Sequence, residues 1–436
     1  MPELDKHTAL PLTAAQQEIW LSLQILGNPR IASVEREILG PLKLSAFEAA
    51  LRRVVSETDA LHTRFVSDGT LVRQVADPSL EWELTVVDLS AAADPRVAAD
   101  AWVDTHWNRA YPIDQGPLFH YALLRLGPDH FWWHQQYHQI MGDISAFSLI
   151  EQRVAEVYRA LVHGEAVPDP GYGSLTGLVD AELAYQESAD FAADRRFWLE
   201  RAAAGLSPTL LAGGPGVGWD SAEVTRGCLR ADQASIEIAG LNRAADAAGV
   251  RRSAVIIAAM AAYIGALSGT ADVVVNLPVG ARVGPVAQAT PGVMSNILPI
   301  RLHIDGQAPF TALARQAAEE VGRVMRHQRF RNEHLVRETG TTAAGQELPG
   351  VIVNIISGGG LDFDGHRTER EIFFACPVDL MTGFCVSGDR MLVSFLANPG
   401  LWDGVGLAGH QERFLRVLGQ VVADPGMRVG AVELLA

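Results

Sequence analysis

Cysteine is scarce in this sequence, and its scarcity excludes two structural classes. The 436 residues include three cysteines, Cys228, Cys376 and Cys385. Three thiols at such wide separations fit neither a disulfide framework nor a zinc site with regular ligand spacing. No other set of histidines and carboxylates shows metal-ligand spacing, so we predict that the chain binds no metal.

Basic residues and long apolar runs are also few. The net charge is −16 at pH 7, whereas proteins that bind nucleic acid carry basic faces, so no nucleic-acid partner is expected. The first residues, MPELDKHTALPL, contain no apolar signal-peptide core. The most apolar run, residues 253–267, is too short and alanine-rich to span a bilayer, and it predicts a helix buried on all sides. We therefore expect a cytoplasmic protein with no membrane partner.

What the sequence does contain is a long alternation of predicted strands and helices. Hydrophobic residues make up 48% of the chain, which is enough for a large core, and the length allows roughly two to three domains. Residues 163–174, HGEAVPDPGYGS, are rich in proline and glycine and form the best linker candidate. We predict two mixed α/β lobes whose sheets are covered by helices, one over residues 1–170 and one over residues 171–436.

Capping patterns and hydrophobic spacing predict the elements around the centre of the first lobe. Thr13 is expected to cap a helix over residues 12–24, and the pattern from Ser45 to Glu48 predicts a capping box at the start of a second helix. The aromatic run FWWHQQ predicts a strand that pairs with the segment before it through a turn at residues 127–129. A helix is predicted after residue 147, because apolar residues recur there at helical spacing.

The stretch YHQIMGDISAF, residues 137–147, joins this strand to this helix. It carries a histidine, an amide and a carboxylate, and such turns place side chains at the mouth of a cleft on a rigid base. Taken alone, these residues favour the simpler interpretation of a hydrogen-bonded core histidine and a helix-capping aspartate. Ser145 is also expected to cap the helix rather than to act as a nucleophile, because no base lies near it in sequence.

Further stretches follow one another in an order that resembles the condensation domains of non-ribosomal peptide synthetases. They are LTAAQQEIW, LHTRF, YHQIMGDISAF, FWLE, PGVMSNILPIRL and RHQRFRNEHLV. Each motif is weakly specific by itself, whereas the ordered set spans nearly the whole chain. The pieces WWHQQYH and MRHQRFRNE are most similar to the N-terminal condensation domain of enterobactin-type siderophore synthetases, which take an aryl acid as donor.

The resemblance implies both a fold and an activity. The fold would be two chloramphenicol-acetyltransferase-like lobes in a V-shaped pseudo-dimer, with a tunnel at their junction. The phosphopantetheine arms of a donor and an acceptor carrier protein, peptidyl or aryl, would enter this tunnel from opposite faces. The acceptor amine would attack the donor thioester to form an amide. The chain would bind no cofactor of its own and act as a monomer or as part of a multidomain synthetase.

The active-site motif of that family has two histidines, three variable residues and then Asp-Gly, and it fits this sequence in two registers. One register places Gly142 at the aspartate position. The other register matches the two histidines with His138 and Gln139, the aspartate with Asp143 and the glycine with Ile144. It also aligns the helix that follows. We adopt the second register.

In this register the resemblance implies a catalytic motif made of His138, Gln139 and Asp143. His138 and Asp143 match residues that are mostly structural in the family, and Gln139 occupies the position of the catalytic histidine. A glutamine amide accepts a hydrogen bond from an amine but cannot hold a proton at pH 7, whereas an imidazole does both. Ile144 replaces a glycine, and a β-branched residue is disfavoured at positive φ, so we expect an altered turn or a tighter tunnel.

The resemblance also assigns residues outside this stretch. Arg282 matches a family arginine that pairs with the motif aspartate, so we predict an ion pair between Asp143 and Arg282 that supports the site. The residues expected to line the substrate tunnel are Gly142, Asn296 and Ser357. A basic cluster on this acidic chain is either a solvated helix end or a dock for a carrier protein and its phosphate. It comprises Arg323, Arg326, Arg329 and Arg331, and carrier docking is assigned to the first three.

Three hypotheses from different functional classes follow. The first is an acyltransferase that forms an amide between carrier-bound substrates. The second is a catalytically degenerate condensation-like module that recruits carrier proteins or tailoring enzymes, which Gln139 and Ile144 favour. The third is an acyltransferase of the wider fold that makes an ester or uses a small soluble acceptor.

Overall fold

The computed structural model describes residues 9–26, 31–67, 69, 71–107, 109–206, 209–211, 229–339, 350–356, 361–374, 379–399 and 401–435. These residues divide between two compact units. Unit 1 comprises residues 1–188, 280–295 and 359–375, and unit 2 comprises residues 189–279, 296–358 and 376–436. Each unit is built from strands and helices, which confirms the predicted mixed α/β fold class.

The two units differ from the predicted division at residues 170 and 171. Unit 1 also takes in residues 171–188, 280–295 and 359–375, which the sequence analysis placed in the second lobe. The proline- and glycine-rich stretch 163–174 packs on unit 1, where Arg153 donates to the carbonyl of Pro168 at 2.7 Å. Proline and glycine in this stretch indicate turns in the backbone. They carry no information about the segments 280–295 and 359–375, which belong to unit 1 although they come later in the sequence.

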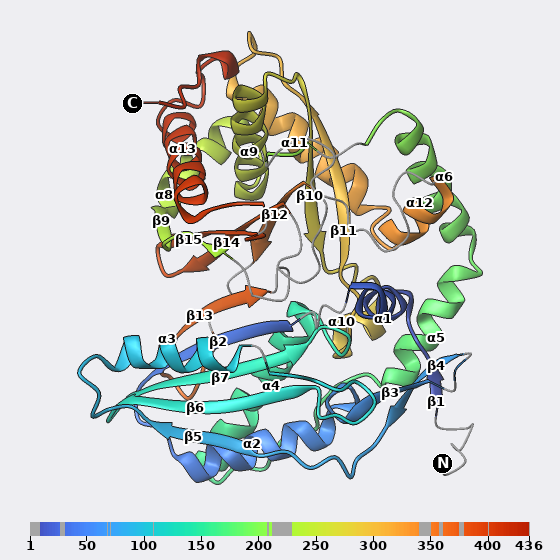
Figure 1. The fold of residues 1–436 in the computed structure, drawn as a ribbon, viewed down its shortest axis with the longest axis vertical. Coiled ribbons are helices and arrows are strands. Elements are labelled where there is room, and N and C mark those ends of the chain that lie inside the picture. The colour runs from blue at the N-terminus through green and yellow to red at the C-terminus, as the bar shows by residue number, and fades with distance from the viewer. Residues whose placement is uncertain are drawn as a thin grey trace. The chain divides into compact units, whose positions relative to one another are not determined.

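Unit 1 is organised around a five-stranded sheet (Figure 1). Its order is β13 (Arg367–Phe374), β2 (Ile31–Leu39), β7 (His130–His138), β6 (Phe119–Gly127) and β5 (Leu84–Asp88). Only β5 and β6 run parallel; the other neighbours are antiparallel. Figure 1 shows β13, coloured orange as part of the second half of the chain, beside the blue strand β2.

Both faces of this sheet are buried, because alternate side chains of its central strands meet different helices. On one face, Trp133 of β7 and Phe47 of α2 (Leu44–Glu57) are in edge-to-face contact at 5.4 Å, in a core shared with α4 (Ile144–His163). On the other face, Trp132 packs in a smaller core with Ala99 and Val103 of α3 (Pro95–His106). The aromatic run of β7 forms a strand paired with β6, as predicted, and the structure also places β2 on its other side.

Helix starts in unit 1 confirm one predicted cap and correct another. Thr13 accepts a hydrogen bond from the N–H of Gln16 and caps α1 (Ala14–Leu26), as predicted. The predicted capping box is wrong, because α2 begins at Leu44 after Lys43, which makes no side-chain cap, and Ser45 lies inside the helix. Helix α4 ends at His163, which is followed by Gly164 with φ 67°.

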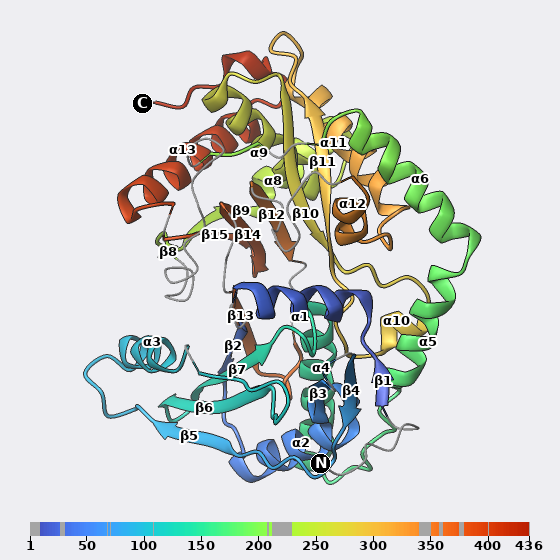
Figure 2. The same cartoon turned by 45° about the vertical axis from the view of Figure 1, so that its right-hand side comes forward.

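A smaller three-stranded sheet and two further helices complete unit 1. The sheet has the order β1 (Ala9–Pro11), β4 (Val72–Ala76), β3 (Thr63–Ser67). A 3₁₀ helix (Asp59–His62) leads into β3. Helix α5 (Leu175–Gln186) packs against α10 (Pro285–Ala289), a short helix contributed by the segment 280–295 (Figure 2).

Unit 2 contains a seven-stranded sheet. Its main order is β11 (Asn296–His303), β10 (Asp272–Val279), β12 (Val351–Ile356), β14 (Leu380–Ser387), β15 (Arg390–Ala397) and β8 (Leu229–Arg230), and β9 (Ala234–Glu237) also pairs with β15. This sheet is contacted by α9 (Arg252–Ser268), α11 (Phe310–Met325), α12 (Asn332–Thr339) and α13 (Gly404–Ala423). Helix α6 (Ala189–Ala203) packs on α12, and α8 (Ile238–Ala248) packs on α9, α11 and α13. The helix predicted over residues 234–248 is therefore shorter than expected, because its first residues join the sheet.

Helix α9 confirms the prediction of a helix buried on all sides. Its residues 254–265 are all buried, and it packs against α8, α11 and α13. No single helix in the described part of the chain is long and apolar enough to cross a membrane. Helices α8 and α9 reach the required length and composition only when taken together, and they meet at an angle of 90°.

Candidate functional site

The predicted site stretch is a turn of five residues between strand β7 and helix α4 in unit 1. His138, the last residue of β7, is fully buried, and its backbone N–H donates to the carbonyl of Leu118 at 2.9 Å. Its ring Nδ1 accepts a hydrogen bond from the N–H of Ile140 at 3.2 Å. A ring nitrogen that accepts cannot carry a proton, so this contact holds the neutral tautomer with hydrogen on Nε2. His138 therefore shapes the turn.

Gly142 brings the turn against the first residues of α4. A Cβ at this position would lie 2.9 Å from the ring of Phe147 and 3.2 Å from the Cβ of Ala146. The Phe147 ring in turn stacks on Tyr137, with centroids 4.0 Å apart and planes inclined by 7°. Only glycine allows this approach without displacing a neighbour. The turn thus rests on a stacked aromatic pair.

Asp143 is the N-cap of α4, and its carboxylate is fully occupied. Oδ1 accepts from the N–H of Ala146 at 2.9 Å and from Arg282 at 2.8 Å. Oδ2 accepts from the N–H groups of Met294 and Ser295, each at 2.9 Å. The predicted cap at Ser145 is wrong, because the preceding aspartate holds the N-cap position and takes the helix N–H.

Arg282 confirms the predicted ion pair and organises the segment around itself. Besides Asp143, its guanidinium donates to the carbonyls of Ala287, Thr290 and Gly292 at 2.6 to 2.8 Å. Both partners of the pair are more than 90% buried, with side-chain exposures of 9% for the arginine and 6% for the aspartate. The pair therefore ties residues 280–295 to the start of α4.

Ile144 shows none of the backbone strain that the sequence predicts. It is the first residue of α4, and it is partly buried against the main core of unit 1. Among the non-glycine residues that the structure describes, only Ala281 and Asp364 have positive φ. Helical backbone accepts a β-branched residue, so isoleucine at this position causes no strain. The predicted change in the turn or in the width of the tunnel stays a prediction.

Gln139 follows His138 directly and is half-buried. Its amide forms no hydrogen bond with the described residues, although it has two donor hydrogens and an acceptor oxygen. Among the residues that the structure describes, the turn therefore holds an unpartnered amide beside a carboxylate whose bonding capacity is already filled. A glutamine amide cannot hold a proton from an amine near neutral pH.

Two further residues were predicted to line the tunnel, and their part in it stays a prediction. Ser357 falls outside the described residues. Asn296, the first residue of β11 in unit 2, donates to the carbonyls of Gln328 and Phe330, each at 2.9 Å. Its Oδ1 accepts from the N–H of Ile297 at 2.9 Å and of Asn332 at 3.3 Å. These four bonds use its amide completely, which favours a structural role in holding the chain after α11.

Replacing Asn296 with alanine is expected to lower the free energy of unfolding of unit 2 by about 1–3 kcal/mol. The change would leave two buried carbonyls and two N–H groups without their partner, and that is the usual cost of such loss. Urea denaturation measures the effect. Asn242→Ala, at an exposed position on α8, serves as control and should stay within about 0.5 kcal/mol of the parent. Equal stability of the two variants would contradict the structural role.

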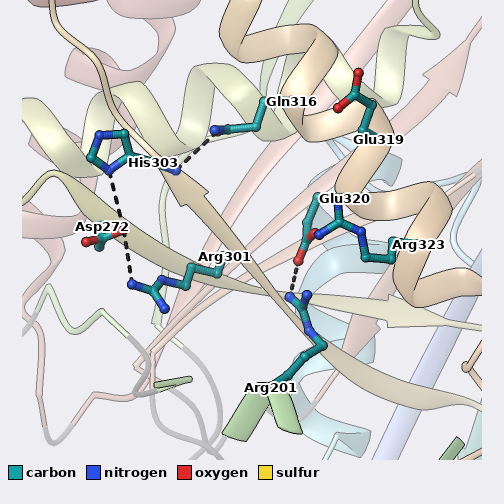
Figure 3. A pocket seen from close by; sticks show the side chains of 8 residues that line it. All are labelled: Arg201, Asp272, Arg301, His303, Gln316, Glu319, Glu320 and Arg323. Carbon is teal, nitrogen blue, oxygen red and sulfur yellow. Dashed lines mark hydrogen bonds and ion pairs between the residues drawn. The ribbon is translucent and has the colours of Figure 1, made fainter. Parts of the chain in front are cut away.

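The predicted docking arginines lie at the end of α11 in unit 2, and most of their charge is engaged locally. Arg323 pairs with Glu320 at 3.2 Å, and Arg326 donates to the carbonyl of Gly322 at 3.0 Å. Arg329 is half-buried. Figure 3 shows Arg323 and Arg201 directed at the same Glu320 carboxylate, which lines a polar pocket of about 660 Å³. Carrier docking by this cluster stays a prediction.

Sequence reasoning missed the groups that complete the bonding of Asp143. The N–H groups of Met294 and Ser295 belong to the backbone, so no side-chain pattern signals them. It also missed Glu151, a carboxylate with 1% exposure on α4. In the described part of the chain, no group of three or more histidines, cysteines or carboxylates is arranged to hold a metal ion.

Comparison with protein families finds that the model described as "Condensation domain" matches residues 6–436. Among curated proteins, a dimodular nonribosomal peptide synthase of Bacillus subtilis is 33% identical over 100% of this chain. An isonitrile lipopeptide synthase of Streptomyces coeruleorubidus is 34% identical over 97%, and enterobactin synthase component F of Escherichia coli O157:H7 is 29% identical over 98%. The chain covers 18%, 29% and 33% of these relatives, respectively.

Solved structures agree with the sequence matches. The starter condensation domain of rhizomide synthetase, crystallised with C8-CoA and Leu-SNAC, superimposes with a TM-score of 0.90 and 35% identity. The match covers 99% of this chain and 98% of that one. The first condensation domain of the calcium-dependent antibiotic synthetase, in complex with a substrate analogue, gives a TM-score of 0.88 and 31% identity over 98% and 99%.

Proposed function

Since this chain belongs to the condensation domains of non-ribosomal peptide synthetases, which are acyl-transferring, amide-bond-forming enzymes, we propose that its reaction takes place at the turn 139–143. The donor is a carrier-bound acyl or aryl thioester, and the acceptor is the amine of a carrier-bound amino acid. One observation carries the proposal: the turn is anchored by a saturated Asp143, while the amide of Gln139 forms no hydrogen bond within the described part of the chain.

The reaction needs one new bond and one proton transfer. The acceptor nitrogen attacks the thioester carbonyl carbon, the C–S bond breaks, and the arm leaves as a thiol with the proton lost by the amine. Gln139 Oε1 orients the amine by accepting one of its hydrogens, but it takes up no proton. The family's histidine position normally supplies both functions, and base assistance contributes roughly 10²–10⁴-fold. Transfer by this chain therefore relies on positioning.

The partners that this proposal requires are a donor and an acceptor carrier protein with phosphopantetheine arms. The relatives are multidomain synthetases, and the rhizomide starter domain was crystallised with an eight-carbon acyl-CoA and a leucyl thioester mimic. We infer a donor without an amino group, either a fatty acyl or an aryl acid of the kind suggested by the likeness to enterobactin synthase. Arg323, Arg326 and Arg329 are proposed to contact an acidic carrier protein.

A second function is favoured by the same residue, Gln139. A domain whose turn has no proton acceptor can keep its carrier-binding surfaces and lose its chemistry. It would then act as a module that recruits carrier proteins or tailoring enzymes. The amide of Gln139 is compatible with both functions. Whether an acylated acceptor forms decides between them.

Intact-mass measurement of both carrier proteins tests the proposal. A donor carrier loaded with an octanoyl or benzoyl group is mixed with a leucyl acceptor carrier and the chain. We expect the acyl mass to leave the donor and to appear on the acceptor. If the masses stay unchanged while the chain co-elutes with a carrier protein, the result would contradict the enzyme proposal and favour the recruitment module. Donor deacylation that depends on a soluble alcohol or amine would indicate the wider acyltransferase class.

A further inference from the structure

A buried charge cluster lies under the site turn in unit 1. Glu151 of α4 binds Arg36 of β2 through two contacts at 3.0 and 2.8 Å, and Arg370 of β13 lies 3.3 Å away. The side-chain exposures are 1% for the glutamate, 3% for Arg36 and 8% for Arg370. Burial alone would raise the pKa of Glu151, but the charges of Arg370 and Arg36 bring it below its ordinary value, so the group is ionised.

The cluster makes β13 part of the support of α4. Arg370 and Arg36 stand directly opposite each other on the antiparallel strands β13 and β2. Like charges in that position repel, and the Glu151 carboxylate between them removes the repulsion. Arg370 also donates to the hydroxyl of Ser148, one turn earlier on α4, at 2.9 Å. A strand from the second half of the chain is thus attached to the first half through α4.

The same carboxylate leads to the turn through a short series of contacts. The side-chain amide of Gln135 on β7 joins two groups. Its Nε2 donates to Glu151 at 2.9 Å, and its Oε1 accepts from the Tyr137 hydroxyl at 2.8 Å. The Tyr137 ring stacks on Phe147, and Gly142 of the turn packs directly on Phe147. Each member of this series is buried. The position of the turn therefore depends on where Glu151 holds Gln135.

We propose that Glu151 is a positioning residue for the turn 139–143. It touches no group of the turn itself. Through Gln135, it fixes the position of the stacked Tyr137 and Phe147 rings that support the turn. Through Arg370, it keeps β13 in register with β2. The inference rests on the proposed function only in taking this turn as the place of the chemistry. The hydrogen-exchange test below requires no acyl transfer.

Helix α4 offers a matched control. Arg153 is equally buried, with 2% side-chain exposure, and forms ion pairs with Glu57 at 3.0 Å and Glu156 at 2.8 Å. Its contacts lead to α2 and to the carbonyl of Pro168, away from the turn. Arg153→Met therefore removes a buried charge from the same helix without touching the series that ends at Gly142.

Hydrogen exchange measured by mass spectrometry on the full chain tests the proposal. Glu151→Gln is expected to speed exchange about ten-fold or more in peptides over residues 139–147 and 367–374, because both lose their support. Arg153→Met should leave both peptides close to the parent. Equal acceleration by the two variants would reduce Glu151 to a general stability residue and overturn the inference. No acceleration by Glu151→Gln would overturn it as well.

A second variant keeps the test decisive if Glu151→Gln fails to fold. Gln135→Met has nearly the same volume, leaves the ion pairs of Glu151 with Arg36 and Arg370 in place, and removes the hydrogen bonds that join Glu151 to Tyr137 through Gln135. It is expected to speed exchange over residues 139–147 but not over residues 367–374. Parent-like exchange in both peptides would contradict the proposed series of contacts. When Glu151→Gln is introduced into a chain that transfers acyl groups, we expect the substitution to lower kcat and to leave KM for the donor carrier unchanged.

Discussion

Replacing Asp143 with alanine is expected to lower the free energy of unfolding of unit 1 by about 3–5 kcal/mol, because it leaves the buried Arg282 without its counter-charge. The change also removes the N-cap of α4 and the acceptor of two backbone N–H groups from residues 294 and 295. We therefore expect the segment 280–295 to lose protection together with the start of the helix. Urea denaturation followed by hydrogen exchange measures both effects.

Two further variants make this result specific. Asp104→Ala, at an exposed position of α3, should change the stability by less than about 0.5 kcal/mol. Adding Arg282→Met to Asp143→Ala removes the unpaired buried charge and should recover part of the loss. An Asp143→Ala protein that melts like the parent but transfers no acyl group would instead make the aspartate a participant in the chemistry.

Replacing Gln139 with histidine is expected to raise acyl transfer about ten-fold or more, within the range that a positioned base supplies. The amide has no partner among the described residues, so an imidazole can take its place without breaking a hydrogen bond. A histidine with its usual pKa near 6.5 also accepts a proton from the amine at neutral pH. The assay follows the masses of matched donor and acceptor carriers over time.

The control for this substitution is Gln186→His, at an exposed position of α5, which should transfer at the parent rate. Equal rates for the parent and Gln139→His would mean that positioning suffices or that Ile144 narrows access. The double variant with Ile144→Gly separates these cases, because rescue only in the double variant points to access. Loss of transfer in every variant, with carrier binding retained, would favour the recruitment module.

Local sequence determined the elements that carry the site. The aromatic run of β7 and the spacing of apolar residues in α4 predict a strand, a turn and a helix, and all three are present in that order. The helix begins at Ile144, earlier than predicted, so the turn is shorter than the stretch 137–147. These patterns work because a buried strand and an amphipathic helix each impose a period on their own residues. The run 253–267 predicts a buried helix for the same reason, and α9 confirms it.

Capping was less predictable, because one N-terminal turn often contains several residues able to cap. Ser45 and Ser145 are suitable by type, yet each lies inside its helix. Asp143 took the cap of α4 because its carboxylate also meets Arg282 and two N–H groups from a distant segment. The simpler interpretation of the stretch already included a helix-capping aspartate, but the long-range partners of Asp143 leave no trace in the local pattern.

Family resemblance supplied the pair of Asp143 and Arg282, which lie 139 positions apart in the sequence, and it supplied the observation that Gln139 stands at the catalytic position. Only the tertiary structure decided what surrounds them. It placed β13 beside β2, and it buried Glu151 between two arginines from opposite halves of the chain. In the sequence, Glu151 is one more charged residue on a helix, a type that usually faces water. Its role arises from strand pairing across more than three hundred residues, and hydrophobic periodicity describes only which side of an element is buried, not which distant element covers it.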